Sequence, residues 1–465
     1  MTLAVPVLLD AENATSDVRH SASAAGGRLT QERRSASGRV CVIGAGPCGL
    51  TTVKNLLAAG IDDIVCYEEG PAIGGNWVYE DEPGRSSVYH ATHLISSKRL
   101  SEFEDFPMPA DYPDFPSHRQ VRGYFESYAR HFNLSPWIAL DSRVARATRL
   151  PDGKWSVEVD GPDGRRVEAF DYLIICSGHH RDPLIPDYPG TFTGRVLHSH
   201  DYKRPEPFKN QRVLVVGGGN SACDIAVDVA RGAASSCISL RHGCYILPKL
   251  MFGRPTDIMY ARLRQYWPFL RDPIARLVVR LAVGPWNKYG LSEPAGSPLT
   301  MHPTLNSAIL AALRDGSVLA RPGIARFDGN LVRFSDGSTE AFDTIVWATG
   351  YRFSYPFLDE TVLGAGFAQS PPLYLTMMHR EISSLFFIGL FQPIGCIWRL
   401  ADHQARIAAL QINGNLHRPA DIGARIAKET SSRARRYGTA PRHLIEVDYH
   451  DFRRELLREL GPYAA

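Results

Sequence analysis

Two segments of the chain show the same change in hydrophobic pattern, from a short apolar run to apolar positions at helical spacing. In the first, the β-rich apolar run 40–43 is followed by Leu50, Val53, Leu56 and Leu57. The second, QRVLVVGGGNSACDIAVDVA at 211–230, repeats this order. A short apolar run predicts a buried strand, and the spacing after it predicts a helix. The pattern therefore predicts an α/β protein that contains two strand–turn–helix units.

The turn of the first unit contains three glycines in the pattern G-x-G-x-x-G. Gly44 permits the tight turn, Gly46 lets a pyrophosphate approach the backbone, and Gly49 lets the helix pack against the strand. The next strand, DDIVCYEE, ends in acid about twenty residues after Gly49, where a carboxylate can bind a ribose diol. Alternation along this strand favours Glu68 over Glu69. The alternative is a tight turn without a ligand. The candidate cofactor-binding residues here are Gly44, Gly46, Pro47, Cys48, Gly49 and Glu68.

The turn of the second unit follows the related pattern G-x-G-x-x-A. Its next strand, SSCISLRHG, offers Arg241 where the first unit ends in glutamate. Arginine can bind a 2′-phosphate with two hydrogen bonds, whereas a carboxylate repels it. The first unit is therefore interpreted as a site for FAD or NAD and the second as a site for NADPH. The alternative for Arg241 is a solvated surface residue. The candidate residues here are Gly217, Gly219, Asn220, Ser221, Ala222 and Arg241.

Two further segments resemble each other and flank the second unit. Each is a strand that runs into a small-residue turn, DYLIICSGHH at 171–180 and AFDTIVWATGY at 341–351. Gly178, Thr349 and Gly350 would let the backbone pass close to a cofactor there. The sequence predicts two Rossmann-like dinucleotide-binding domains, with the NADPH domain inserted into the FAD domain. The predicted parts are a flexible extension (1–38), the first part of the FAD domain (39–206), the NADPH domain (207–342) and the second part of the FAD domain with C-terminal helices (343–465).

The segment 245–290 is an amphipathic insertion rich in arginine and aromatic residues. One interpretation is that it packs on the NADPH domain or over the mouth of the active site. The alternative is a helix that lies on a membrane surface. The apolar positions that approximate a helical stripe are Leu263, Tyr266, Trp267, Leu270, Ile274, Leu277, Val278 and Leu281.

Composition narrows the class of protein. The 465 residues are 44% hydrophobic and 22% charged, with a formal net charge of +3, which argues against a nucleic-acid-binding protein. No apolar run is long enough to span a bilayer. The eight cysteines form no C-x-x-C pair, so reduced thiols in a cytoplasmic protein are expected, without a redox disulfide. No metal site is expected, and a homodimer is left open.

Several short motifs together resemble the flavin-containing monooxygenases, from Arg39 to about Asn415. The motifs are GAGPCG, GGNW, DFPMP, FPSHRQVRGYFESYARHF, CSGHH, FTGRVLHSHDY, GGGNSACD, ATGY and IGLFQPIG. The resemblance implies FAD and NADPH as cofactors, with O2 and a small molecule as substrates. It also implies a C4a-peroxyflavin that oxygenates nitrogen or sulfur compounds or inserts oxygen into ketones.

The resemblance also implies roles for individual residues. FTGRVLHSHDY matches the family pattern F-x-G-x-x-x-H-x-x-x-Y, which links the domains and helps to position the nicotinamide. The implied catalytic residues are His198, Tyr202 and Gln392. The other implied cofactor-binding residues are Gly75, Asn76, Trp77, Ile95 and Val144. The alternatives are a structural histidine at 198 and loop packing or local hydrogen bonding for Asn76, Trp77 and Gln392.

One departure from the family pattern concerns the reactive edge of the flavin. Animal members carry an asparagine at the position of Ile95, and isoleucine cannot donate its amide hydrogen bond. His93 is a partial substitute. The continuation YKR at 202–204 and the N-terminal extension favour the bacterial type II subgroup, whose members also oxidise ketones. The alternatives are a dedicated Baeyer–Villiger monooxygenase and a non-oxygenating FAD/NADPH redox protein. A disulfide reductase is disfavoured because no close cysteine pair is visible.

Overall fold

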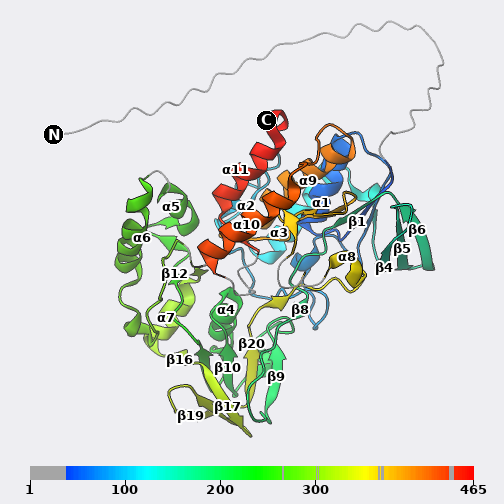
Figure 1. Cartoon of the computed structure of the whole chain (residues 1–465). Coiled ribbons are helices and arrows are strands. Elements are labelled where there is room, and N and C mark those ends of the chain that lie inside the picture. Colours follow the sequence, from blue (N-terminus) through cyan, green and yellow to red (C-terminus); the bar gives the residue numbers. More distant parts are fainter. Residues whose placement is uncertain are drawn as a thin grey trace, which may run out of the picture. The chain divides into compact units, whose positions relative to one another are not determined.

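The computed structural model describes residues 38–263, 266–299, 301, 303–364, 367, 371–438 and 445–464. The predicted flexible extension at 1–38 lies outside the described residues, except for Gly38. The structure contains two main β-sheets, each built around one of the predicted strand–turn–helix units (Figure 1).

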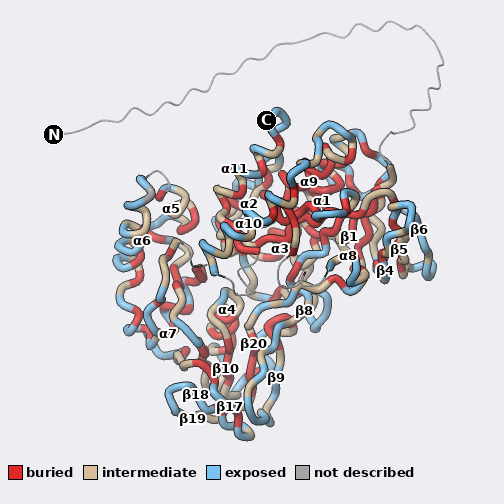
Figure 2. The backbone as a smooth tube through the Cα atoms, viewed as in Figure 1, coloured by how far each residue is buried: buried red, intermediate tan, exposed pale blue. Residues whose placement is uncertain are grey.

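The first sheet has seven strands in the order β22-β23-β24-β7-β1-β2-β3. Its central strand β1 is buried along its whole length (Figure 2) because α1 packs on the sheet and α9 packs against α1. β1 is parallel to β2 and to β7, as a βαβ connection requires. The bounds are β1 (Val40–Ile43), β2 (Ile64–Tyr67), β3 (Ile138–Ala139), β7 (Tyr172–Ile175), β22 (Leu373–Tyr374), β23 (Met378–His379), β24 (Leu385–Phe387), α1 (Pro47–Ala58) and α9 (Ile397–Ile412).

The second sheet has five strands in the order β16-β11-β10-β20-β9, and all its pairings are parallel. The helix α4 packs on β10 and β11, and α7 packs against α4. The bounds are β9 (Arg195–His198), β10 (Arg212–Val216), β11 (Ser235–Ser239), β16 (Leu319–Arg321), β20 (Thr344–Trp347), α4 (Asn220–Val229) and α7 (Ser307–Asp315). The predicted α/β class with two Rossmann-like units is confirmed.

The two units repeat the same order of elements along the chain. In each, a three-stranded antiparallel meander leads into a strand that pairs with the first strand of the unit. The first meander is β4 (Arg143–Arg149), β5 (Trp155–Gly161) and β6 (Gly164–Phe170), which precedes β7. The second is β17 (Ile324–Asp328), β18 (Leu331–Phe334) and β19 (Thr339–Ala341), which precedes β20. The similar segments at 171–180 and 341–351 therefore occupy equivalent positions in the two units.

The predicted domain limits at 206/207 and 342/343 pass between strands of one sheet. β9 lies before the first limit and β20 after the second, yet β20 pairs with both β9 and β10. We therefore propose that the inserted domain extends from β9 to β20. All strands of the second sheet lie between β7 and β22 in the sequence, as expected for an insertion.

The insertion forms two packed helices rather than one stripe. They are α5 (Thr256–Leu263) and α6 (Pro268–Val283). The buried face of α6 consists of Ala275, Val279 and Val283, whereas the stripe residues Trp267 and Leu281 are about 70% exposed, at 71% and 69%. The predicted stripe is therefore wrong as a buried face. The helical spacing of the stripe does not continue through one helix, because Pro268 cannot donate an interior helix hydrogen bond and begins a new helix.

Smaller elements connect and extend the sheets. They are α2 (Lys98–Ser101), α3 (His118–His131), β8 (Asp182–Pro183), β12 (Ile246–Leu247), β13 (Leu250–Met251), β14 (Arg254–Pro255), β15 (Thr304–Leu305), β21 (Tyr351–Arg352), α8 (Glu360–Leu363), β25 (Gln392–Pro393), α10 (Ile422–Tyr437), β26 (Glu446–Val447) and α11 (Tyr449–Leu460). Among the described residues, no helix has the length and apolar character needed to cross a membrane.

Candidate active site

The first glycine-rich turn is sterically closed to side chains. Gly44 has φ of +99°, and a Cβ atom there would lie 2.9 Å from the carbonyl oxygen of Cys176. A Cβ on Gly49 would lie 1.8 Å from the carbonyl oxygen of Gly44. Gly75 of the GGNW motif packs on the same turn, since its Cβ would lie 2.9 Å from the Cα of Gly46. The backbone surface is thus bare where a pyrophosphate would approach.

The start of α1 leaves backbone donors for an anion. Gly46 caps the helix without a side-chain hydrogen bond, and Pro47 occupies the first turn. The N–H groups and the dipole of such a helix end favour a phosphate. Cys48 is half-buried, desolvation raises the pKa of its thiol to about 12, and a Cβ on Gly389 would lie 2.5 Å from its sulfur. Cys48 therefore packs beneath the IGLFQPIG segment as a neutral thiol.

The two acidic residues after β2 have different surroundings. The buried Glu68 carboxylate accepts hydrogen bonds from the N–H groups of Ala45 (2.8 Å) and Gly70 (2.9 Å). Burial raises the pKa of Glu68, and the two donors oppose that shift. Glu69 instead forms an ion pair with the exposed Arg181. Glu68 therefore lies beside the glycine-rich turn, as the alternation along the strand predicts.

The second turn repeats this geometry with one larger residue. Gly217 has φ of +136°, and a Cβ there would lie 2.3 Å from the carbonyl oxygen of Ala348. Gly219 caps α4 without a side-chain hydrogen bond, and nothing lies within 4 Å of the position of its missing Cβ. Asn220 accepts a hydrogen bond from the N–H of Leu305 at 3.0 Å. Ser221 and Ala222 continue the first turn of α4, with Ala222 fully buried.

Arg241 and the two crossing turns lie at strand ends. Arg241 follows β11 by two residues and is exposed, so it can reach a ligand from solvent or remain solvated. Gly178 and Gly350 have positive φ values of 74° and 88°. Gly178 follows β7, which pairs with β1, and Gly350 follows β20, which pairs with β10. The hydroxyl of Thr349 donates to the carbonyl of Leu184.

The FTGRVLHSHDY segment and the lysine after it contact both units, because Tyr202 and Lys203 reach in opposite directions. His198 ends β9 and is buried, which lowers its pKa to about 4, and its Nδ1 accepts from the N–H of His200. Tyr202 donates to Asp228 of α4 at 2.7 Å. Lys203 reaches the other way and donates to the carbonyl of Ser86 at 2.5 Å. The contacts of Lys203 and Asp228 were not predicted, because neither residue belongs to the family pattern.

The predicted flavin-side residues lie in hydrogen-bonded loops. Asn76 Oδ1 accepts from both the N–H (2.7 Å) and the hydroxyl (2.9 Å) of Ser87. Trp77 packs edge-on against Trp398 with ring centres 5.8 Å apart. Gln392 Oε1 lies 3.4 Å from Nε2 of His179, a neighbour that the sequence did not predict. The Asn76 side chain thus makes local hydrogen bonds, which is the alternative that the sequence left open for this residue.

A cavity joins residues of both units. Ile95 and Gly395 line it from the first unit, and Asn220 and Leu305 from the second, while Asp257 and Tyr260 come from α5. The structure thus brings Ile95 and Asn220 to one site and places the insertion at its wall. Tyr260 and Asp257 were missed because no motif surrounds them in the sequence.

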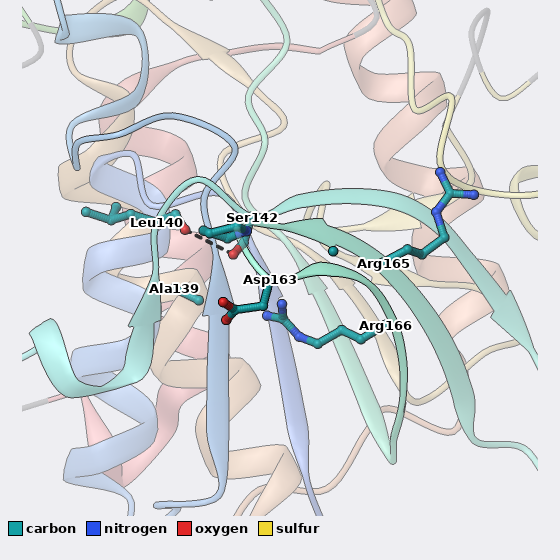
Figure 3. A pocket seen from close by; sticks show the side chains of 8 residues that line it. Ala139, Leu140, Ser142, Asp163, Arg165 and Arg166 are labelled. Carbon is teal, nitrogen blue, oxygen red and sulfur yellow. Dashed lines mark hydrogen bonds between the residues drawn. The ribbon is translucent and has the colours of Figure 1, made fainter.

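A second recess lies at the edge of the first unit (Figure 3). It is lined by the end of β3 and the β5–β6 turn, with Ser142, Arg165 and Arg166 among its side chains. Both arginines already form ion pairs, with Asp160 and Glu168 respectively. Val144, two residues after Ser142, is buried on β4. None of the predicted site residues lines this recess.

Comparison with known proteins agrees with this geometry. The sequence profile of the flavin-binding monooxygenase-like family matches residues 37–463. The chain belongs to this family. Dimethylaniline monooxygenase (N-oxide-forming) 2 of Rattus norvegicus is 34% identical over 446 residues, which cover 91% of this chain and 82% of that protein. Flavin-containing monooxygenase 5 of Homo sapiens is 32% identical and covers 91% of this chain and 83% of its own length.

Among solved structures, the S-allyl-L-cysteine S-oxygenase of Allium sativum aligns with a TM-score of 0.70 and 24% identity. This alignment covers 91% of this chain and 88% of that one. The flavin-binding monooxygenase-like protein described here is an FAD- and NADPH-dependent monooxygenase, so both predicted cofactors are confirmed. The bare glycine turns, the open α1 and α4 ends and the Glu68 carboxylate fit two dinucleotides.

Proposed function

We propose that this monooxygenase transfers one oxygen atom from O2 to a small molecule that carries a nucleophilic nitrogen or sulfur, or to a ketone. The observation that carries the proposal is the cavity lined by Ile95 and Gly395 on one side and Asn220 on the other. Because residues of both units line it, we infer that the reacting ends of the two cofactors would meet there. The name of the N-oxide-forming relative supports heteroatom oxygenation.

Each unit contributes binding groups for its cofactor. We propose that the first turn and Glu68 hold the FAD pyrophosphate and ribose, and that the second turn and Arg241 hold NADPH. Bound FAD, once reduced by NADPH, supplies the oxygen-activating chemistry, so the chain needs to supply binding, orientation and a dry site. His198 and Tyr202 act as positioning residues, since the Tyr202–Asp228 hydrogen bond fixes the linker to α4.

Ketone oxidation is a second candidate reaction. Ile95 lines the cavity, and its side chain has no hydrogen-bond donor. The site therefore lacks the amide that the animal pattern places there, which favours the ketone-oxidising type II subgroup. Cyclohexanone monooxygenase of Rhodococcus sp. Phi1, with a TM-score of 0.67 at 16% identity and coverage of 92% of this chain and 98% of that one, supports only the shared fold.

The experiment that tests the proposal uses isotopic oxygen. The FAD-loaded enzyme receives NADPH under ¹⁸O2 with a thioether, a tertiary amine or a cyclic ketone, and products are analysed by mass spectrometry. We expect one ¹⁸O atom in a sulfoxide, N-oxide or lactone. Hydrogen peroxide formation without labelled product from any class would contradict oxygenation and support a non-oxygenating redox protein.

Location and assembly are further proposals. Six of the cysteines are at least 95% buried, as reduced thiols that act as small apolar side chains in cytoplasmic proteins are; they are Cys41, Cys66, Cys176, Cys223, Cys237 and Cys396. We propose a cytoplasmic enzyme on this ground. A homodimer is tested by light scattering of the purified chain, where a mass of twice 51.5 kDa would support it.

A further inference from the structure

The hydroxyl group of Tyr260 is buried in the wall of the cavity and lacks a hydrogen-bond partner. Tyr260 lies on α5, and among the described residues no atom accepts from or donates to its hydroxyl. A buried polar group without a partner costs about 1–3 kcal/mol, and buried hydroxyl groups in folded proteins are usually paired. An unpaired hydroxyl that lines a cavity therefore indicates a ligand group that pairs with it.

The helix that carries Tyr260 is fixed to the flavin-side wall. The buried Asp257 carboxylate accepts from the N–H of Ser97 (2.6 Å) and of Ile258 (2.8 Å). Ser97 follows Ile95 by two residues, so α5 is bound directly to the segment that carries Ile95. The position of the Tyr260 hydroxyl relative to this segment is therefore set by a charge-assisted hydrogen bond.

The other walls of the cavity identify the part of the ligand that enters it. Asn220 is the first residue of α4, at the turn assigned to NADPH. Its side-chain oxygen accepts a hydrogen bond from the N–H of Leu305. Ile95 and Gly395 belong to the unit assigned to FAD. A dinucleotide whose pyrophosphate lies on α4 must extend its nicotinamide end toward the flavin, and hence into this cavity.

We propose that Tyr260 is a positioning residue whose hydroxyl donates a hydrogen bond to the carboxamide oxygen of the NADP(H) nicotinamide. The proposal rests on the proposed NADPH site at the second turn. Burial raises the pKa of the Tyr260 phenol, so the group stays protonated and remains a donor at neutral pH. Ile95, which lines the same cavity, has no side-chain donor, so the Tyr260 hydroxyl supplies a donor that Ile95 cannot.

The direct test compares two ligands on the FAD-loaded full chain by calorimetry. NADP⁺ contains the carboxamide, whereas adenosine 2′,5′-bisphosphate keeps the 2′-phosphate and lacks the nicotinamide. In Tyr260→Phe we expect the Kd for NADP⁺ to rise by about 3- to 10-fold, the range for a neutral hydrogen bond. The Kd for adenosine 2′,5′-bisphosphate should stay unchanged. Tyr266→Phe, at a tyrosine that is 48% exposed, is the matched control and should change neither.

The outcomes separate this inference from the proposed NADPH site. If the wild-type chain binds neither ligand, the site at the second turn is wrong, and the role of Tyr260 fails with it. If the wild type binds both and Tyr260→Phe weakens both equally, or neither, the carboxamide contact is wrong while the site stands. Thio-NADP⁺, whose sulfur is a weak acceptor, should bind the wild type and Tyr260→Phe with similar affinity.

Thermal unfolding of the chain without NADP(H) gives a second readout. Removal of a hydroxyl that is unpaired in the protein should leave the Tm of Tyr260→Phe equal to or above that of the wild type. A lower Tm would show that the hydroxyl is paired within the protein itself, which would overturn the inference. In turnover, Tyr260→Phe should release a larger fraction of hydrogen peroxide per NADPH consumed.

Discussion

The two dinucleotide units share one backbone plan and differ in the side chains at several equivalent positions. In the first, the N–H of Gly44 donates to the carbonyl of Tyr67, and in the second, that of Gly217 donates to Ser239. This register makes Glu68 equivalent to Leu240. Backbone hydrogen bonds to the next strand agree, since the N–H of Glu68 bonds to β3 and that of Leu240 to β16.

The difference at this position supports the proposed assignment of FAD to the first unit and NADPH to the second. Glu68 places a carboxylate against Ala45, whereas Leu240 packs near Gly218 and leaves no charge there. Arg241, the next residue, is equivalent to Glu69 and is exposed. The second unit thus lacks the acid that would repel a 2′-phosphate and carries a cation one position further along the chain.

The two units also differ at the third small residue of the turn and in the strand that pairs with β7 or β20. Gly49 has no room for a Cβ, whereas the equivalent Ala222 carries one in a fully buried position. The strand pairing makes the buried His198 of β9 equivalent to the buried Phe387 of β24. The second unit therefore carries a titratable ring where the first has an apolar one.

The largest expected effect is at the third glycine of the first turn. Gly49→Ala forces a Cβ to within 1.8 Å of the Gly44 carbonyl oxygen, so the turn must open. We expect the purified variant to lose nearly all bound FAD, measured as the flavin-to-protein absorbance ratio. Ala222→Gly, the reciprocal change, should retain FAD and cost about 1 kcal/mol of stability as an interior helix glycine. Full flavin retention in Gly49→Ala would contradict the assignment of this turn.

The next effect concerns the carboxylate after β2. Glu68→Ala leaves the N–H groups of Ala45 and Gly70 without their partner, at about 1–3 kcal/mol for each buried donor. We expect lower stability in urea unfolding and a rise in the FAD dissociation constant. The control Glu69→Ala breaks a half-exposed ion pair with Arg181 and should cost less than about 1 kcal/mol. Equal effects of the two variants would show that Glu68 has no special role.

Coenzyme preference should change at Arg241. A charge-assisted hydrogen bond is worth about 1.5–3 kcal/mol, so Arg241→Ala should lower kcat/KM for NADPH by about 10- to 100-fold. The value for NADH should change by less than about 2-fold, because NADH lacks the 2′-phosphate. Steady-state assays with both coenzymes measure this. An unchanged NADPH-to-NADH ratio would identify Arg241 as a solvated residue.

The smallest effect is the pH dependence contributed by His198. Burial lowers its pKa from 6.5 to about 4 in the folded chain, so between these values the unfolded state binds the proton and the folded state does not. This residue therefore makes stability fall as pH decreases from 6.5 toward 4, by at most about 1.4 kcal/mol per pH unit. In His198→Asn, urea unfolding should show a shallower slope over this window. An unchanged slope in His198→Asn would contradict this contribution.

The local elements were predictable, and the long-range pairings were not. A strand, a glycine turn and a helix follow one another within about twenty residues, so 40–58 and 212–229 carry their own signal. The pairing of β20 with β9 joins residues about 150 positions apart, and no local pattern encodes it, which is why the proposed bounds of the inserted domain differ from those expected from the sequence. The same holds for Tyr260, whose proposed role rests on a cavity formed by five separate segments of the chain.

The most direct test of the central claim follows the flavin spectrum after two mixing steps. The FAD-loaded enzyme is reduced with NADPH without air and is then mixed with oxygenated buffer that contains no substrate. We expect fast reduction by NADPH and a slow return of the oxidised spectrum while NADP⁺ remains bound, with a thioether or cyclic ketone accelerating that return. Immediate reoxidation with stoichiometric hydrogen peroxide, unaffected by either substrate, would contradict the claim that the two units form a monooxygenase site.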